Sequence, residues 1–152
     1  PEFKLLVPVG QSGNIQIPHY TFDAHEPEYS GGRNFCAFKI EKYDGDMYAS
    51  VYFYNICSSS EFYIYFDNNN DGKSDTTLKC TPSTVEVYSI GSDGKATLSA
   101  SAVPRINKTC YSMIVPWDIV FGKGGVNRFN LLESSDKTAT GDRLPDSGWV
   151  IP

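Results

Sequence analysis

Apolar and polar residues alternate with a period of two through much of this chain, and aromatic and β-branched residues fill many of the apolar positions. Alternation of this kind is typical of a strand with one buried face. The sequence has no convincing window with the i, i+3, i+4, i+7 apolar spacing of an amphipathic helix. The chain is therefore expected to be all-β.

The clearest hairpin signal lies between residues 35 and 56. Two alternating stretches, 35–42 and 47–56, flank the turn Tyr43-Asp44-Gly45-Asp46. Asp-Gly favours the positive φ angles of a tight turn whose twist matches that of paired strands. We expect a β-hairpin centred on Asp44 and Gly45.

Further strands are expected where the alternation returns between turn signals. They cover residues 61–66, 85–90, 96–100, 109–115 and 128–132, with opening strands at 4–9 and 14–17. Residues 19–33 and 133–148 are rich in Pro, Gly and polar residues and are expected to form long surface loops. Many short strands without a repeat or a linker predict a single domain, an antiparallel β-sandwich of the jelly-roll or immunoglobulin-like kind.

The composition suits one folded domain and argues against two classes of partner. The chain has 152 residues, is 40% hydrophobic and carries 10 Tyr and 9 Phe, which is enough apolar material for one core. Its net charge of −5, without a basic cluster, argues against nucleic acid binding. No apolar run reaches the roughly 20 residues that span a bilayer, so membrane insertion is not expected.

The first three residues have a different interpretation from the rest. Pro1, Glu2 and Phe3 are interpreted as the remnant of a cloning site. Residues 4–152 are then the single sandwich domain, which we expect to be excised from a larger secreted protein in which it is tethered to other domains.

A glycosylation sequon and the cysteines indicate an extracellular or cell-surface location. Asn107-Lys108-Thr109 is an acceptor sequence for N-glycosylation at Asn107. An even number of cysteines suits an oxidising compartment, and no C-x-x-C pair of the zinc or redox type occurs.

Two disulfides are expected, Cys36 with Cys57 and Cys80 with Cys110, out of three possible connectivities. Cys36 and Cys57 lie near the open ends of the predicted hairpin, where a bulge or a non-strand tail is needed to bring them together. The alternative is four reduced thiols in the core.

An acidic loop follows the strand predicted at 61–66 and reads D-x-N-x-D-G-x-x-D. Oxygen ligands at this spacing converge where a glycine, here Gly72, lets the backbone turn sharply. Leu78 stands at the twelfth position, where the helix-loop-helix calcium hand needs Glu, so the loop is not that hand. The alternative is a solvated turn, because Asn, Asp and Gly are also preferred turn residues. The expected Ca²⁺ ligands are the side chains of Asp67, Asn69, Asp71 and Asp75 and the carbonyl oxygen of Lys73.

Aromatic side chains provide the candidate ligand surface, because a sugar ring stacks on an exposed indole or phenol ring while nearby polar groups bind its hydroxyls. Trp149 follows the predicted loop at 133–148, and Asp142 and Arg143 in that loop are the expected hydrogen-bonding partners of the sugar hydroxyls. Trp117 is a second candidate, although a place in the core is the alternative for each tryptophan. Exposed tyrosines at alternating strand positions are expected to add a further platform.

No sequence motif of a hydrolase, a metalloprotease or a phosphate-binding loop is present. His19 and His25 flank an acidic stretch, but their spacing is typical of solvated loop residues. We therefore expect a protein that is not an enzyme.

The order of features in the second half adds a family resemblance. An aromatic strand ends in the acidic loop, and a later strand runs into Ile114-Val115-Pro116-Trp117. A glycine stretch, Arg128-Phe129-Asn130, Gly141-Asp142-Arg143 and Trp149 then follow. Over residues 61–152 this series resembles the family 9 carbohydrate-binding modules and the related DOMON-like sandwich domains. The resemblance implies a sandwich, often stabilised by calcium, that binds sugars through aromatic residues and is tethered to larger secreted enzymes or surface proteins.

The sequence thus favours a non-catalytic carbohydrate-binding module that recognises a polysaccharide or another glycan. An adhesion or protein-interaction domain of a secreted or cell-surface protein is the alternative, because the same sandwich, disulfides and sequon would serve it. A third hypothesis is a haem-binding DOMON domain that uses Met47 or Met113 with His19 or His25.

Overall fold

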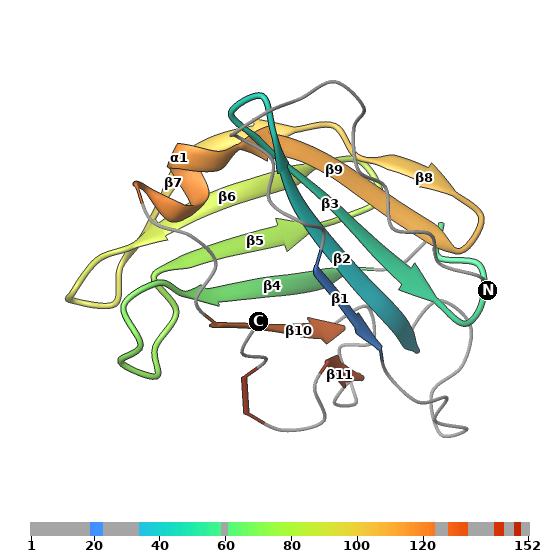
Figure 1. The fold of residues 1–152 in the computed structure, drawn as a ribbon, viewed down its shortest axis with the longest axis horizontal. Helices are drawn as coiled ribbons and strands as arrows, with labels where there is room; N and C mark the ends of the chain where they lie inside the picture. The colour runs from blue at the N-terminus through green and yellow to red at the C-terminus, as the bar shows by residue number, and fades with distance from the viewer. Residues whose placement is uncertain are drawn as a thin grey trace.

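The fold is the antiparallel β-sandwich expected from the sequence (Figure 1). The structure, a computed structural model, describes residues 19–22, 34–58, 61–123, 128–133, 142–144 and 148–149. The strands are β1 (His19–Phe22), β2 (Phe35–Tyr43), β3 (Asp46–Phe53), β4 (Phe62–Asp67), β5 (Thr76–Cys80), β6 (Val85–Ile90), β7 (Ala96–Ala102), β8 (Arg105–Asn107), β9 (Cys110–Pro116), β10 (Arg128–Glu133) and β11 (Arg143–Leu144), with helix α1 (Trp117–Phe121) between β9 and β10.

The described strands form two sheets. One has five strands in the order β1-β2-β3-β9-β8, and the other has six in the order β11-β10-β4-β5-β6-β7. The chain builds β1 to β3 in the five-stranded sheet, β4 to β7 in the six-stranded sheet, and then returns to each in turn. Elements far apart in sequence therefore become neighbours, and β10 pairs with β4.

The predicted hairpin is confirmed as β2 and β3, with Tyr43 paired to Asp46 across the turn. Asp44 has φ 52° and Gly45 has φ 80°, so both central residues take the left-handed conformation that a primed turn needs. The carbonyl oxygen of Gly45 accepts a hydrogen bond from the Trp117 N–H (2.9 Å), which ties the turn to the start of α1.

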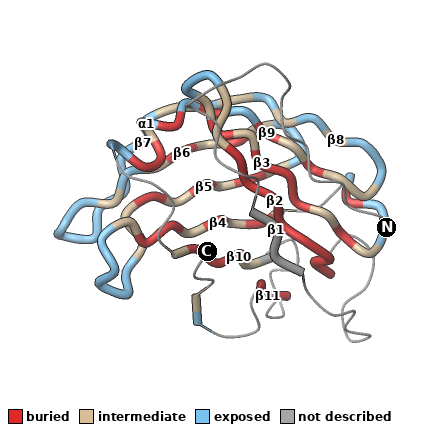
Figure 2. The backbone as a smooth tube through the Cα atoms, viewed as in Figure 1, coloured by how far each residue is buried: buried red, intermediate tan, exposed pale blue. Residues whose placement is uncertain are grey.

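The core lies between the two sheets and is rich in aromatic rings. Buried and half-buried residues alternate along β4 and β5, as period-two strands with one inward face require (Figure 2). Phe62 lies edge-on to Phe35, Phe53 and Tyr111, with ring centroids 6.1, 5.7 and 4.8 Å apart. Edge-to-face pairs of this kind stabilise a core by about 0.5–1.5 kcal/mol beyond their buried area.

Some elements differ from the sequence-based expectation. Residues 19–22 and 143–144 were expected in loops, yet they form β1 and β11 by pairing with β2 and β10. Strand β5, strand β8 and the short helix α1 were not expected, because each is defined by its neighbours more than by its own alternation. The predicted strands at 4–9 and 14–17 and the interpreted remnant at 1–3 lie outside the described residues.

The predicted disulfide pairing does not match this fold, in which all four cysteines are thiols. Cys80 on β5 faces the core, whereas Cys110 on β9 lies on the outer side of the other sheet, with its Sγ 3.3 Å from the Ser112 hydroxyl. Packed sheets are about 10 Å apart, and a disulfide needs Cα atoms within roughly 7 Å.

Cys36 and Cys57 are not linked in this structure either. Cys36 sits at a bulge of β2, between the residues paired to Phe53 and Tyr52. Cys57 contacts Lys108 in the β8–β9 turn, and β3 and β9 lie between β2 and β8. The bulge anticipated for Cys36 is therefore present, while Cys57 hydrogen-bonds to the β8–β9 turn.

Buried thiols predict loss of stability in alkali. Burial, with a contribution from nearby Cys110, raises the pKa of Cys57 to about 11, and burial raises the pKa of Cys80 well above its usual value. Their protonated forms favour the folded state, so this contribution is complete below the unfolded pKa near 9 and declines as pH rises toward 11. For Cys57 alone it amounts to about 3 kcal/mol.

Urea unfolding of the reduced protein at pH 8 and pH 10.5 should reveal this decline. Cys57→Ala should show a weaker dependence on pH, since it removes one titrating thiol. A free energy of unfolding that stays constant between these pH values would contradict the prediction.

Candidate metal centre and aromatic face

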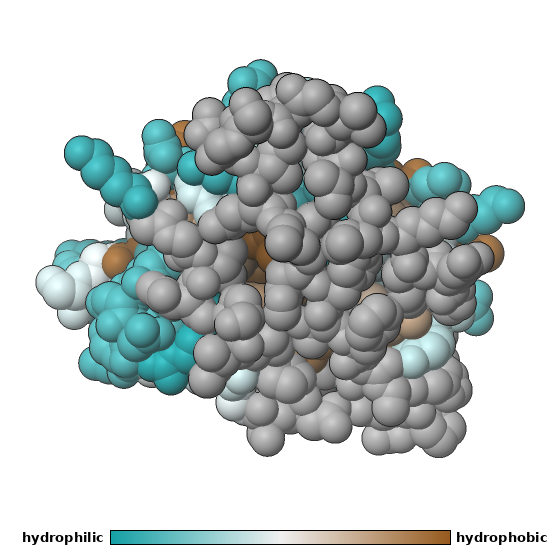
Figure 3. Space-filling model, in the orientation of Figure 1, coloured by the Kyte–Doolittle hydropathy of each residue, from teal (hydrophilic) through white to brown (hydrophobic). Residues whose placement is uncertain are grey.

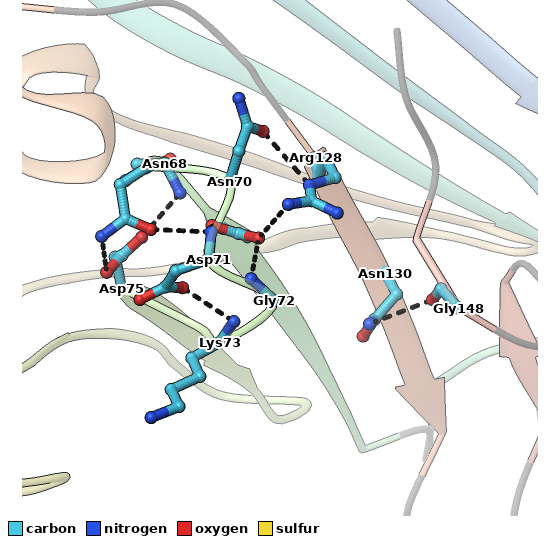
Figure 4. A network of polar contacts seen from close by, with 11 residues as sticks. Asn68, Asn70, Asp71, Gly72, Lys73, Asp75, Arg128, Asn130 and Gly148 are labelled. Carbon is cyan, nitrogen blue, oxygen red and sulfur yellow. Dashed lines mark hydrogen bonds and ion pairs between the residues drawn. The ribbon is translucent and has the colours of Figure 1, made fainter.

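Three aspartates come together at the β4–β5 connection and can hold a metal ion (Figure 4). Asp67 ends β4, Asp71 lies at the loop tip, and Asp75 directly precedes β5. One carboxylate oxygen from each lies within 4.8 Å of the others. Asp67 is buried, Asp75 is half-buried and Asp71 is exposed, so the cluster runs from the protein interior to solvent.

The backbone turns sharply between these aspartates. Asn70 has φ 62° and Gly72 has φ 83°. A Cβ on Gly72 would meet nothing within 4 Å, so the glycine is needed for its backbone conformation and not for space. This agrees with the role assigned to Gly72 from the sequence.

Backbone N–H groups hold the carboxylates in place. Asp67 Oδ1 accepts from the Asp71 N–H (3.2 Å), and Asp67 Oδ2 accepts from the Gly72 N–H (2.8 Å). Asp71 Oδ1 accepts from the Lys73 N–H (2.9 Å), and Asp75 Oδ2 accepts from the Asn68 N–H (2.7 Å). At least one oxygen of each carboxylate has a further lone pair, so these bonds orient the ligands without using up their capacity.

Arg128 of β10 supplies a positive charge behind the cluster. Its Nη2 lies 3.2 Å from Asp67 Oδ2, and its Nε donates to Asn70 Oδ1 (3.1 Å). The pair forms because β10 and β4 are neighbours with Arg128 opposite Asp67. Three carboxylates with one guanidinium leave an excess of negative charge, which a divalent cation would neutralise.

The other two predicted ligands also belong to this loop. Asn69 accepts from the Asp71 N–H through its Oδ1 (3.1 Å) and donates from Nδ2 to Asp75 Oδ1 (3.3 Å), so its amide lies within the cluster. Lys73 contributes the N–H that binds Asp71, and a ligand role for its carbonyl oxygen stays a prediction. The sequence analysis did not predict that Arg128 belongs to this site.

An open cleft of about 780 Å³ lies between this loop and the β6–β7 turn. Most of the residues that line it are polar, and they include Asp71, Asp75, Thr77, Ser92 and Asp93. The surface of the β4–β5 loop is correspondingly hydrophilic, at the lower left of the view in Figure 3. The candidate metal centre is thus open to solvent on one side, so an ion can reach it.

A second candidate surface is the outer face of the six-stranded sheet, which carries three tyrosines. Tyr63 and Tyr65 on β4 are half-buried and stacked, with ring centroids 5.9 Å apart and planes inclined by 23°. Tyr65 is opposite Thr77, and Thr77 is opposite Tyr88 of β6. Since inward and outward positions alternate along a strand, all three phenols lie on the same face.

Polar groups lie among these rings. The Tyr88 hydroxyl donates to Glu86 Oε2 (3.1 Å). Partial desolvation, this hydrogen bond and the Glu86 charge raise the pKa of Tyr88, while Lys79 acts in the opposite direction. Lys79 is opposite both Tyr63 and Glu86. We name the outward residues Tyr63, Tyr65, Thr77, Lys79, Glu86 and Tyr88 the tyrosine face.

Asn130 and Trp149 lie at the β10 side of the tyrosine face. Asn130 is opposite Tyr65, and its Nδ2 donates to the carbonyl oxygen of Gly148 (3.3 Å, Figure 4). Its Oδ1 is buried and has no hydrogen-bond partner among the described residues. Trp149 follows Gly148 directly and is half-buried.

The remaining predicted ligand residues have other positions. Trp117 is in the core and 1% exposed. Its ring centroid lies 4.3 Å from that of Phe121, and the Lys42 Nζ lies 5.2 Å from the Trp117 ring centroid. Asp142 is 1% exposed and accepts a hydrogen bond from the Phe35 N–H (2.7 Å). Both expectations of ligand contact are corrected, because each residue has a structural partner inside the fold. Arg143 lies on β11, and its side chain is outside the described residues.

Residues of the other hypotheses are placed as well. Met47 and Met113 pack in the core, at 0% and 2% exposure, which is the position of structural methionines. Asn107 is exposed at the end of β8, and its glycosylation stays a prediction. The side chain of His19 and all of His25 lie outside the described residues.

Comparisons with protein-family models, curated proteins and solved structures found no match to this chain. Within the described ranges, helix α1 is too short to cross a bilayer and no longer apolar helix occurs. Function must therefore be argued from the two candidate surfaces.

Proposed function

We propose that this chain is a non-catalytic carbohydrate-binding module of a secreted or cell-surface protein, with a glycan on the tyrosine face and Ca²⁺ at the β4–β5 loop. The observation that carries the proposal is the stacked, half-exposed pair Tyr63 and Tyr65. Two neighbouring aromatic rings with nearly parallel planes offer an apolar surface on which sugar rings can stack.

The neighbours of the pair suit hydroxyl-rich ligands. Lys79 donates, Glu86 accepts, and Thr77 does both, and these residues lie within one strand spacing of the rings. Asn130 is opposite Tyr65 and binds the carbonyl oxygen of Gly148, so the following Trp149 is held near the β10 side of these rings and can extend the aromatic surface. Trp149 therefore remains a proposed ligand residue, now as a border of the tyrosine face.

Calcium is the ion that suits the loop. All candidate ligands are oxygens from carboxylate or amide groups, which hard cations prefer over the nitrogen and sulfur ligands of zinc. Ca²⁺ binds oxygens at about 2.3–2.6 Å, so oxygens that share one ion are at most about 5 Å apart. The spacing within 4.8 Å meets that limit.

The resemblance to family 9 carbohydrate-binding modules and DOMON-like domains supports the same function by fold alone. The tyrosine face spans three neighbouring strands, β4, β5 and β6, so it has room for two or more sugar units. The proposed ligand is therefore a polysaccharide or an extended oligosaccharide. Tethering to other domains of a secreted protein, and extracellular location, belong to this proposal.

Tyr65→Ala and Tyr63→Ala are expected to weaken glycan binding by roughly fivefold or more each, since an aromatic contact contributes about 1 kcal/mol or more. A glycan panel followed by calorimetry on the best ligand measures the effect. Tyr48→Ala is the matched control, because Tyr48 is a half-buried tyrosine on β3 of the other sheet. A wild-type panel without any hit would overturn the function and favour the adhesion alternative. Binding unchanged in Tyr65→Ala and Tyr63→Ala would overturn the site alone.

A further inference from the structure

The chain that leaves β3 reaches the β8–β9 turn at Cys57. The Cys57 N–H donates to the carbonyl oxygen of Lys108 (2.9 Å), and the Cys57 thiol donates to the same oxygen (3.1 Å). Cys57 is fully buried there. Its sulfur is therefore fixed at the base of this turn.

Cys110 begins β9 directly after the same turn. Asn107 is opposite Cys110, and Lys108 takes a left-handed conformation with φ 54°, so the turn is tight. A further hydrogen bond from the Phe53 N–H to the Thr109 carbonyl oxygen (2.8 Å) binds the two segments on the strand side. Hydrogen bonds to Lys108 and Thr109 thus hold the Cys57 segment against the residues that precede Cys110.

Thiol chemistry agrees with this proximity. The charge that Cys110 would carry as a thiolate contributes to raising the pKa of Cys57, after burial as the main cause. Cys36 lies on β2 and Cys80 on β5, whereas Cys110 is the cysteine whose charge contributes to the raised pKa of Cys57.

We propose that Cys57 and Cys110 form a disulfide when this domain is in an oxidising compartment, while Cys36 and Cys80 stay reduced. Cys57 hydrogen-bonds to Lys108, two residues before Cys110, so its backbone lies at the turn from which Cys110 begins β9. A disulfide needs Cα atoms roughly 4.4–6.8 Å apart. The link joins the β3–β4 connection, which crosses between the sheets, to the β8–β9 turn beside Asn107.

The oxidant is a small disulfide such as oxidised glutathione. Half-buried Cys110 loses its proton to water, and its thiolate attacks one sulfur of the oxidant, forming a mixed disulfide and releasing one thiolate. Cys57 then gives its proton to that thiolate or to water and displaces the second glutathione sulfur from Cys110. Two protein thiols become one disulfide, and one oxidised glutathione becomes two reduced molecules.

The test oxidises the folded protein with oxidised glutathione, blocks remaining thiols, and maps peptides by mass spectrometry without reduction. The expected product is one cross-linked pair of peptides that contain Cys57 and Cys110, with Cys36 and Cys80 blocked as thiols. The double variant Cys36→Ser, Cys80→Ala should form the same link. A link of Cys36 or Cys80, or four blocked thiols, would overturn the proposal.

Stability gives a second readout. The link closes a long loop, so the oxidised protein should melt roughly 10 °C above the reduced protein. Cys110→Ser should melt at the same temperature in both conditions, since it can form no link with Cys57. If it also gained on oxidation, another pair would be responsible. Neither readout depends on glycan binding.

Discussion

Trp117→Ala is expected to lower the free energy of unfolding by about 3–5 kcal/mol, because truncating a buried tryptophan removes its contacts and leaves a cavity. Trp117 is 1% exposed, and its ring centroid lies 4.3 Å from that of Phe121. Its backbone N–H donates to the Gly45 carbonyl oxygen, and an alanine at this position has the same donor. The loss should reduce the melting temperature by roughly 10–15 °C. Urea and thermal unfolding measure both quantities.

Trp117→Phe is the control for this prediction, since it keeps an aromatic ring in the same site and should cost less. It also stays informative if Trp117→Ala does not fold. Glycan affinity of the folded variants should equal that of the wild type, because Trp117 is not on the tyrosine face. An unchanged melting temperature with lost glycan binding would return Trp117 to the ligand site.

The hairpin at Asp44-Gly45 was predictable because its information is local. Two adjacent residues with positive φ favour one turn type, and that turn sets the register of both strands. Strand β1 was not predictable, because residues 19–22 become a strand only by pairing with β2. The sequence of residues 19–33 does not encode that pairing locally. Helix α1 is a single short turn after Pro116, below the length at which periodicity can be read.

The candidate site divides in the same way. Asp67, Asp71 and Asp75 could be predicted together because one short loop carries all three. Arg128 could not, since it reaches Asp67 through the pairing of β10 with β4. Asp142 looked like a loop ligand in sequence, but the fold uses its carboxylate for the N–H of Phe35, 107 positions away. Long-range pairing, and not residue type, decides these roles.

The tyrosine face could be predicted only in part from the sequence. Period-two alternation predicted that several phenols would share a sheet face, and Tyr63 and Tyr65 do so within one strand. Tyr88 joins them only because β5 pairs with both β4 and β6. The sequence thus indicated that an aromatic platform exists, while the sheet order determines where it is.

Asp67 and Asp71, at the buried and exposed ends of the metal cluster, should differ in how much stability their substitution removes. Asp67→Asn removes a buried carboxylate that pairs with Arg128 and accepts two backbone N–H groups. In chelator we expect it to lower the free energy of unfolding by about 2–3 kcal/mol, less than the loss for a fully buried pair because the Arg128 side chain is 24% exposed. Asp71→Asn, at the exposed loop tip, should change stability in chelator by about 0.5 kcal/mol or less.

Calcium separates the structural and metal roles of these residues. At free Ca²⁺ 100 times its dissociation constant, the wild type should gain about 2.7 kcal/mol over its value in chelator, because the ion binds only the folded state. Both variants should lose this gain, so Asp67→Asn falls about 5 kcal/mol below the wild type in calcium, and Asp71→Asn falls about 2.7 kcal/mol below it. Thermal melts of the three proteins in calcium, in magnesium and in chelator measure the pattern. If the wild type melts identically in all three conditions, the loop is a solvated turn, and the Asp67→Asn loss then reports the Arg128 ion pair alone.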